Sequence, residues 1–188
     1  MKKIPIIIAL ALLCLNFRSA ERKQEPIIKP FRVGEKLPEA FWKQQHHFYE
    51  KGKLISGTLE RYKDKLLILD FWATWCGSCI HNFSMSDSLQ MVYKSQLAVV
   101  LVNSKTSGDT TVGIGRVMSR FGDRLTSIVS DSLLGKQFPH TVIPHYVWIE
   151  GGQLRSITGS ELMTEQSIIS SFDRRKRIDS KMKNLLNQ

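Results

Sequence analysis

The sequence predicts an α/β fold with a central mixed β-sheet flanked by helices and with an N-terminal extension. Two apolar runs of strand length, 66–71 and 97–102, are continuous, which is typical of strands buried on both faces of a parallel sheet. Residues 145–150 and 153–158 are strand-like on either side of two glycines, which indicates a hairpin. Strands that alternate with helical segments and end in a hairpin predict an α/β sandwich.

The remaining elements follow along the chain. Residues 31–59 have no clear period and contain glycine and proline, so we expect turns with one short strand and one short helix. A helix is expected at 76–94, although its apolar positions are imperfectly spaced, and a loop rich in Ser, Thr, Gly and Asp at 103–110. Three shorter elements complete the pattern: a helix at 113–121, a strand at 126–130 and a short helix at 133–138.

A helix is predicted at the end of the chain. Thr164 can cap it, because a threonine hydroxyl accepts a hydrogen bond from the first turn. Apolar residues then recur at helical spacing: Ile168, Phe172, Ile178, Met182 and Leu185. Much positive charge lies here as well: Arg174, Arg175, Lys176, Arg177, Lys181 and Lys183. This run could contact anionic lipid or nucleic acid, but a solvated helix face is the simpler interpretation.

The first twenty residues differ from the rest. A basic start precedes the apolar run 4–15, which is too short to span a bilayer and indicates a secretory signal peptide. Cleavage after Ala20 is one interpretation, although Arg18 fits the cleavage site poorly. Lipidation of Cys14 is the alternative, and it would anchor the protein to a membrane, although Leu13 is bulky for a lipoprotein signal.

These features divide the chain into three parts. Residues 1–20 are the signal peptide, removed or lipid-processed, 21–32 form a linker, and 33–188 form the domain with its basic C-terminal helix. Without the first part the chain has 24 basic and 17 acidic residues, a net charge of +7. We therefore expect an exported, periplasmic protein, either soluble or membrane-anchored, for which nucleic acid is not a partner.

The predicted mature chain keeps two cysteines, Cys76 and Cys79, directly after the strand at 66–71. At a helix N-terminus, unpaired backbone N–H groups and the positive end of the helix dipole stabilise a thiolate. The thiolate is the nucleophile of disulfide exchange, and a second thiol one helical turn later can resolve the mixed disulfide. A structural staple is the alternative, but so small a loop constrains little. The motif therefore predicts thiol–disulfide chemistry.

Two blocks of the sequence carry a family resemblance. One reads Asp-Phe-Trp-Ala-Thr-Trp-Cys-Gly-Ser-Cys at 70–79. The other, about 65 residues later, reads Val-Ile-Pro-His-Tyr-Val-Trp-Ile at 142–149 and is followed by two glycines. Together they resemble the active-site motif and proline loop of the thioredoxin superfamily, particularly the exported TlpA/ResA-like thiol–disulfide oxidoreductases. The similarity runs from about residue 33 to the end of the last helix.

The resemblance implies roles for individual residues. Cys76 matches the attacking thiol and Cys79 the resolving thiol. Pro144 matches the family's cis-proline beside the dithiol, where the backbone of Ile143 can pair with an extended substrate chain. The other residues of the implied docking surface flank the first cysteine: Trp75, Gly77 and Ser78.

Asp70 precedes Cys76 by six residues, where thioredoxins carry a buried aspartate below the resolving cysteine. The resemblance therefore implies that Asp70 accepts the proton of Cys79. A strand-end aspartate facing water is the alternative. The neighbouring strand at 98–102 supplies no lysine or arginine that would offset the burial of this carboxyl. Trp72, by contrast, is expected to pack in the core.

The sequence also departs from the family pattern. Gly-Ser between the cysteines replaces the more common Gly-Pro, and Asn82 stands where many TlpA/ResA-like proteins have a glutamate, so that acid's role is not carried over. His81 is expected on the surface. The other histidines show no ligand spacing: His46, His47, His140 and His145. We therefore expect neither a metal nor a cofactor.

These observations predict an exported thiol–disulfide oxidoreductase that reduces protein disulfides. The neutral Gly-Ser pair favours a reductant. The resemblance implies that such a reductant, in an oxidising compartment, receives its electrons from a membrane thiol carrier. A thiol peroxidase is one alternative, but such enzymes carry Pro-x-x-x-Thr-x-x-Cys, and here the proline is missing before Cys76 and the threonine spacing is short. A non-catalytic binding module is the other, although the chain retains both cysteines, Asp70 and Pro144.

Overall fold

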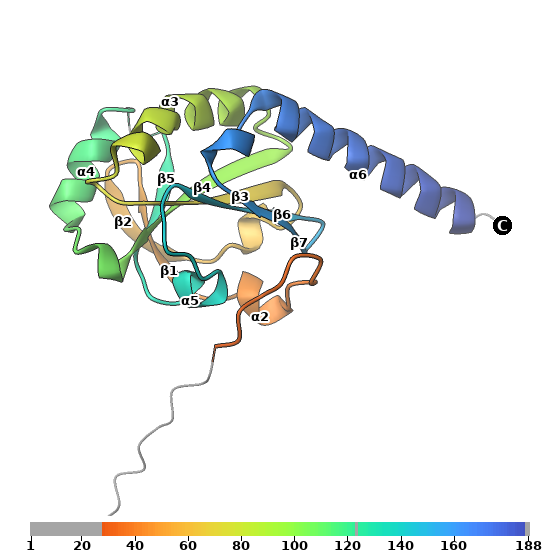
Figure 1. Ribbon diagram of the computed structural model, residues 1–188, viewed down its shortest axis with the longest axis horizontal. Coiled ribbons are helices and arrows are strands. Elements are labelled where there is room, and N and C mark those ends of the chain that lie inside the picture. The colour runs from red at the N-terminus through yellow and green to blue at the C-terminus, as the bar shows by residue number, and fades with distance from the viewer. Residues whose placement is uncertain (1–27, 123, 187–188) are drawn as a thin grey trace, which may run out of the picture.

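The computed structural model describes residues 28–122 and 124–186 (Figure 1). The predicted signal peptide, with Cys14 and Ala20, lies outside these residues, as does the linker up to residue 27. In the described part of the chain, no helix is both long and apolar enough to cross a bilayer.

The described strands form one mixed sheet of seven strands in the order β2-β1-β5-β4-β3-β6-β7. Neighbours β3 and β4, and β4 and β5, are parallel, whereas the other pairs are antiparallel. The bounds are β1 His46–Glu50, β2 Lys53–Gly57, β3 Leu66–Trp72, β4 Leu97–Ser104, β5 Thr126–Asp131, β6 His145–Glu150 and β7 Gln153–Thr158. The predicted mixed sheet and its C-terminal hairpin are confirmed.

Helices cover both faces of this sheet (Figure 1). Their bounds are α2 Glu39–Trp42, α3 Gly77–Val92, α4 Thr111–Ser119, α5 Leu134–Gln137 and α6 Glu165–Leu186, with 3-10 turns at Glu60–Tyr62, Lys105–Ser107 and Ser160–Leu162. Helices α3, α4 and α6 contribute to one buried cluster, and α2 and α5 to the other. The four helices predicted after residue 70 are confirmed within a few residues at each end.

Strand β3 separates the two clusters. All of its residues are buried, and successive side chains point to opposite faces. Its odd-numbered members Leu67, Leu69 and Phe71 face α2 and α5, and its even-numbered members Leu66, Ile68 and Trp72 face α3, α4 and α6. By the same alternation, the side chain of Asp70 lies on the α3 side of the sheet.

The N-terminal part of the domain corrects the prediction of one strand within residues 31–59. It contains the short helix α2 and two strands, β1 and β2, which pair as a hairpin. Lys51 and Gly52 form the turn with positive φ angles of 50° and 75°, the combination that suits a two-residue hairpin. The second strand was missed because β2 is exposed along nearly its whole length and shows no apolar alternation. In addition, Phe31, from the predicted linker, packs against Phe41 and Phe138.

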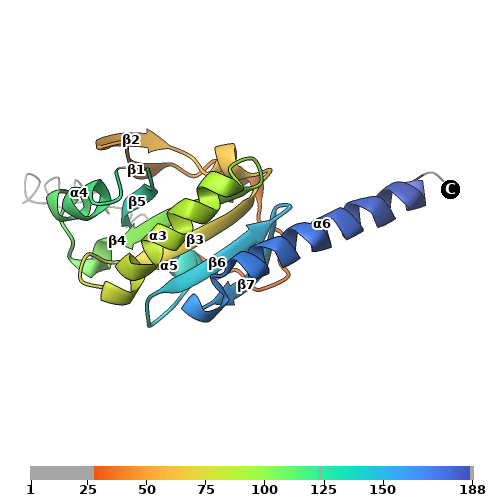
Figure 2. The same ribbon diagram turned by 90° about the horizontal axis from the view of Figure 1, so that it is seen from above.

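Helix α6 packs on the domain only through its first turns. The N–H of Ser167 donates to the Thr164 hydroxyl at 3.2 Å, which confirms the predicted cap. Ile168 and Phe172 are buried in the α3-side cluster. The rest of the helix projects away from the sheet in both views (Figures 1 and 2). Accordingly Ile178 and Leu185 are exposed, and the side chain of Met182 lies outside the described part of the structure.

A pair of substitutions tests this division of α6. Ile168→Ala should lower the free energy of unfolding by roughly 2–5 kcal/mol, because it opens a cavity in the core. Ile178→Ala removes the same atoms from the projecting part and should change stability by less than about 0.5 kcal/mol. Urea unfolding of both variants measures the difference. An equal loss of unfolding free energy in both variants would contradict the division of α6, because it would mean that Ile178 is packed as tightly as Ile168.

Candidate functional site

The two cysteines form a disulfide at the start of α3, with their Cα atoms 5.3 Å apart. Cys76 is the N-cap residue, and the backbone N–H of Cys79 donates to its sulfur at 3.2 Å. Cys76 is 6% exposed, whereas Cys79 is fully buried in the α3-side cluster. The first cysteine thus has a backbone donor on its sulfur and is the more accessible of the two.

Asp109 ties the segment before the cysteines to the loop that follows β4. Its carboxylate accepts hydrogen bonds from the backbone N–H of Thr74 at 2.8 Å and from the Thr74 hydroxyl. The Asn103 amide donates to the same carboxylate at 2.6 Å and to the carbonyl of Trp72 at 3.3 Å. Although partial burial raises the pKa of Asp109, the hydrogen bonds from Thr74 and Asn103 lower it more, so the net shift is downward. The carboxylate therefore stays charged and holds the two segments together.

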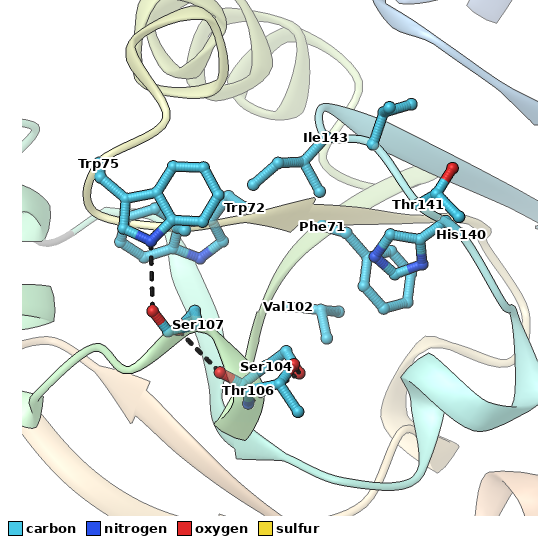
Figure 3. A pocket seen from close by; sticks show the side chains of 12 residues that line it. Phe71, Trp72, Trp75, Val102, Ser104, Thr106, Ser107, His140, Thr141 and Ile143 are labelled. Atoms are coloured by element: carbon cyan, nitrogen blue, oxygen red, sulfur yellow. Dashed lines mark hydrogen bonds between the residues drawn. The ribbon is translucent and has the colours of Figure 1, made fainter.

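Trp75 lies at the surface in a defined orientation. Its side chain is 67% exposed, yet its indole N–H donates to the carbonyl of Ser107 at 3.2 Å (Figure 3). Ser107 is held in turn by a hydrogen bond from its hydroxyl to the carbonyl of Ser104 at 2.8 Å. One face of the site is therefore an aromatic ring anchored to the loop after β4.

Ile143 and Pro144 lie in the loop between α5 and β6, and the peptide bond between them is cis. Ile143 and Trp75 both line a cavity of about 200 Å³ beside the dithiol. The cavity is surrounded by three segments, from the end of β3, the loop after β4 and the loop before β6: Phe71, Trp72, Ala73, Trp75, Val102, Ser104, Thr106, Ser107, His140, Thr141, Val142 and Ile143 (Figure 3). The structure thus brings the two sequence blocks at 70–79 and 142–149 together.

Asp70 is completely buried, and neither carboxylate oxygen accepts a hydrogen bond from any residue that the structure describes. Loss of hydration raises the pKa of this carboxyl well above its ordinary value. The side chain lies on the sheet face that α3 covers, the face to which Cys79 contributes. A strand-end aspartate facing water, the alternative interpretation, is therefore wrong.

A polar pair lies next to Asp70. Tyr146 is its partner across β3 and β6, and the Tyr146 hydroxyl accepts a hydrogen bond from the Asn82 amide at 3.3 Å. Burial and the nearby Asp70 carboxyl both raise the pKa of Tyr146. Asn82 thus contacts a buried hydroxyl at the position where the family resemblance leads one to expect a glutamate.

Two histidines stack beside the cavity. The rings of His140 and His145 lie 4.4 Å apart and nearly parallel, and both contact Phe71. Burial and the neighbouring His140 lower the pKa of His145 to about 4, so His145 is neutral at physiological pH. His81 is exposed on α3, as predicted. Among the described residues, no group of three or more His, Cys, Asp or Glu side chains is placed to hold a metal ion.

Several of these residues were not identified from the sequence. The sequence alone predicts only a polar loop for Asn103, Ser107 and Asp109, and it shows no ligand spacing or other role for His140. The composition of 103–110 was a weak signal, because Ser, Thr and Asp favour turns whatever their function. Trp72 is buried and donates to the Ser127 hydroxyl at 3.0 Å, as expected of a core residue.

Comparisons with known proteins agree with this geometry. The family model described as thioredoxin matches residues 56–115, which include both cysteines. Thioredoxin-like protein YneN from Bacillus subtilis is 43% identical over 54 residues, 27% of this chain and 32% of that protein. Thioredoxin-1 from Drosophila melanogaster is 42% identical over 45 residues, 24% of this chain and 42% of that protein. The matches thus span less than half the length of these relatives.

Solved structures extend the likeness to most of the domain. The thioredoxin domain of a thiol–disulfide oxidoreductase from Bacteroides vulgatus superposes with a TM-score of 0.57 at 13% identity, over 77% of this chain and 97% of that chain. An exposed lipoprotein thioredoxin from Streptococcus pneumoniae superposes with a TM-score of 0.55 at 20% identity, over 70% of this chain and 99% of that chain. The mixed sheet with the dithiol at the start of α3 is a thioredoxin-like fold, and residues 56–115, with both cysteines, match the thioredoxin family model.

Proposed function

We propose that this protein is an exported thiol–disulfide oxidoreductase that reduces disulfides in other proteins. The observation that carries the proposal is a dithiol at a helix N-terminus on the same sheet face as a buried carboxyl without a hydrogen-bond partner in the described structure. The match of residues 56–115 to the thioredoxin family model supports the reaction class. The structure describes the oxidised state, so the cycle begins when a dithiol donor reduces Cys76–Cys79.

The first step of the proposed reaction is attack by the Cys76 thiolate on one sulfur of a substrate disulfide. A bond forms between Cys76 and that sulfur, and the other substrate sulfur leaves as a thiolate that takes a proton from water. The N-cap position stabilises the attacking thiolate, because the Cys79 N–H donates to this sulfur and the helix dipole is positive there. Cys76 is also the more exposed of the two sulfurs.

In the second step Cys79 attacks the sulfur of Cys76. The Cys76–Cys79 disulfide forms, the mixed disulfide breaks, and the second substrate sulfur leaves as a thiolate that takes a proton from water, so that two electrons have passed to the substrate. Cys79 is buried and must lose its proton inside the protein. Asp70 is the proposed acceptor, because burial gives its carboxyl a raised pKa and hence a high affinity for a proton.

Substrate docking is assigned to the surface around the cysteines. Trp75 and Ile143 both line the cavity, and Gly77 and Ser78 follow Cys76 at the start of α3. The proposal is that an extended substrate chain pairs with the backbone of Ile143, next to Pro144, while its disulfide lies over Cys76. Gly77 carries no side chain, and open space lies where its Cβ would be, so the approach to Cys76 is unobstructed there.

Export and a reducing direction complete the proposal. The basic and apolar N-terminus supports export, and similar structures include a secreted disulfide oxidoreductase from Mycobacterium tuberculosis and the exposed pneumococcal lipoprotein. No cationic side chain lies between the cysteines, which leaves the thiolate less stabilised and favours a reductant. The electron donor proposed for an oxidising compartment is a membrane thiol carrier.

The roles of the two cysteines can be tested by trapping. Cys76→Ser should abolish reduction of insulin disulfides, whereas Cys79→Ser should accumulate a mixed disulfide on Cys76, because the resolving thiol is missing. Non-reducing gels and mass spectrometry of both variants measure the adducts. Faster alkylation of Cys79 than of Cys76 in the reduced protein at neutral pH would contradict the assignment. Consumption of hydrogen peroxide without insulin reduction would instead indicate a peroxidase.

The direction of electron flow can be tested by equilibration with glutathione. We expect a reduction potential nearer the roughly −270 mV of thioredoxin than the roughly −120 mV of a strong oxidant, because Gly-Ser adds no positive charge beside the thiolate. Quantifying the reduced and oxidised protein after alkylation gives the potential. A reduction potential above about −180 mV, in the range of disulfide isomerases, would show that the protein does not act as a reductant.

The role of Asp70 can be tested with Asp70→Asn. A raised folded-state pKa means that stability falls as pH rises from the unfolded value, about 3.9, through the folded value. The free energy of unfolding of the variant should therefore be higher than that of the wild type by roughly 1–3 kcal/mol at pH 8, which is the cost of burying a polar group without a hydrogen-bond partner. At pH 4 the difference should be much smaller. It should also slow the decay of the mixed disulfide.

The exposed Asp64 supplies the control, since Asp64→Asn makes the same chemical change in solvent. Urea unfolding at both pH values and stopped-flow measurement of the resolving step provide the readouts. An unchanged resolution rate between pH 6 and 9, with no gain in stability, would show that Asp70 has no part in proton transfer.

A further inference from the structure

We propose that the projecting half of α6, residues 174–186, docks the protein on an anionic lipid bilayer and lies along its surface. This contact uses none of the residues that react at the dithiol, so the inference stands apart from the proposed function. It also differs from lipidation of Cys14, because it needs no modification of the chain. In both views this half of α6 extends away from the sheet (Figures 1 and 2).

The projecting half carries a dense positive charge. Residues 174–186 include six basic residues and one acidic residue, a net charge of +5. The helix dipole favours cations only in the last turn, where Lys183 lies, so it does not account for Arg174 or Arg177 more than two turns earlier. Arg177 and Lys181 are four residues apart, a spacing at which like charges repel and destabilise a helix. An anionic partner would relieve this repulsion.

Apolar side chains share one face of the helix with some of these cations. A stripe with a spacing of four, three and four residues consists of Arg174, Ile178, Lys181 and Leu185. Ile178 is 39% exposed and Leu185 is 64% exposed. Such a mixture is typical of helices that lie in the plane of a membrane interface. Their apolar side chains enter the region below the headgroups, while the long basic side chains reach the phosphates.

A bilayer fits this face better than a second copy of the chain or a nucleic acid does. A second copy would bring the same positive charge against the helix, which is unfavourable. A nucleic acid supplies negative charge but no apolar layer for Ile178 and Leu185. An anionic bilayer supplies both, since its charged headgroups cover the acyl chains. The combination of charge and exposed apolar residues therefore favours lipid as the occupant.

The position of α6 leaves the dithiol free. Helix α3 begins beside Cys76, and its 16 residues span about 24 Å. Tyr93, directly after α3, contacts the ring of Phe172 and donates a hydrogen bond to the Glu165 carboxylate at 2.8 Å. From there α6 extends away from the end of the domain that carries the dithiol (Figure 2). A protein docked through residues 174–186 therefore keeps Cys76 accessible from solution.

The domain adds positive charge beside the first turns of α6. Lys94 follows Tyr93, and the Lys94 carbonyl accepts a hydrogen bond from the Lys65 ammonium at 2.6 Å. Both lysines line a cavity of about 390 Å³ at the start of β4. The other two basic residues of this lining are paired with acids: Arg61 with Glu50 and Arg124 with Asp87. Lys65 and Lys94 therefore add to the attraction, which acts over a Debye length of about 8 Å at physiological salt.

Vesicle sedimentation with the full chain tests the role of the charge. The protein is mixed with phosphatidylcholine vesicles, with and without the anionic lipid phosphatidylglycerol, and the partition coefficient is measured. The double substitution Arg177→Gln and Lys181→Gln should weaken binding to anionic vesicles by roughly 25-fold, since each basic residue near such a surface contributes roughly fivefold. The control, Lys43→Gln with Lys53→Gln, removes the same charge from exposed residues outside α6 and should weaken binding much less.

A second pair of variants separates a bilayer from a soluble polyanion. Ile178→Ser with Leu185→Ser keeps the charge and should weaken binding to anionic vesicles by roughly tenfold, because less apolar surface is buried. Leu54→Ser with Ile55→Ser makes the same change at exposed residues of β2 and should leave binding unchanged. Unchanged vesicle binding in the Ile178 and Leu185 variant would indicate a site for polyanions and would overturn the inference.

The comparisons are matched. All variants carry the same N-terminal residues, so these contribute equally to each partition coefficient, and circular dichroism confirms that each variant is folded. Equal binding of the wild type to neutral and anionic vesicles would overturn the inference, as would an equal loss in the Arg177 and Lys181 variant and its control.

Alkylation tests the orientation of the docked protein. The reduced Cys76 thiol should react with iodoacetamide at the same rate in free and vesicle-bound protein, as measured at that residue by mass spectrometry. Protection of Cys76 by anionic vesicles would show that the dithiol end docks instead, which would overturn the assignment to α6. A failure to reduce insulin would count against the proposed function alone.

Discussion

Strand β3 lies between β4 and β6 in the middle of the sheet, and each of its residues from Leu66 to Trp72 is buried. This burial has two consequences for the site. It places the carboxyl of Asp70 among buried apolar residues, where its charged form is costly, and it leads the chain past the exposed Trp75 to Cys76, the N-cap of α3. The same strand thus positions both residues of the proposed mechanism, the nucleophile Cys76 after its end and the proton acceptor Asp70 six residues earlier.

The site is assembled at the end of the sheet where the carboxyl ends of the parallel strands β3 and β4 lie. The segment after β3 carries Trp75 and Cys76, and the loop after β4 carries Ser107 and Asp109. Strand β6 runs antiparallel to β3, so the start of β6, after Pro144, lies beside the end of β3. Ligand sites in α/β sheets commonly form where strands end in this way, since the loops can vary without disturbing the core.

Much of this arrangement could be predicted because its signals are local. Continuous apolar runs identified β3 and β4, two glycines identified the β6–β7 hairpin, and the cysteine spacing identified the dithiol. The link between Thr74 and Asp109 could not be predicted, because it joins residues 35 positions apart and depends on the parallel pairing of β3 and β4. Strand β2 was missed for a different reason. It lies at the edge of the sheet with its side chains in solvent, so burial left no pattern in the sequence.

In the proposed mechanism, burial keeps the Asp70 carboxyl ready to accept the proton of Cys79, which lies on the same face of the sheet. A carbon-13 NMR titration of the side-chain carboxyl, in the oxidised and the reduced protein, measures this directly. We expect a pKa for Asp70 well above that of an ordinary aspartate, and a further change when Cys79 is reduced and can itself titrate. A pKa near the ordinary value of about 3.9 in both states would contradict the account.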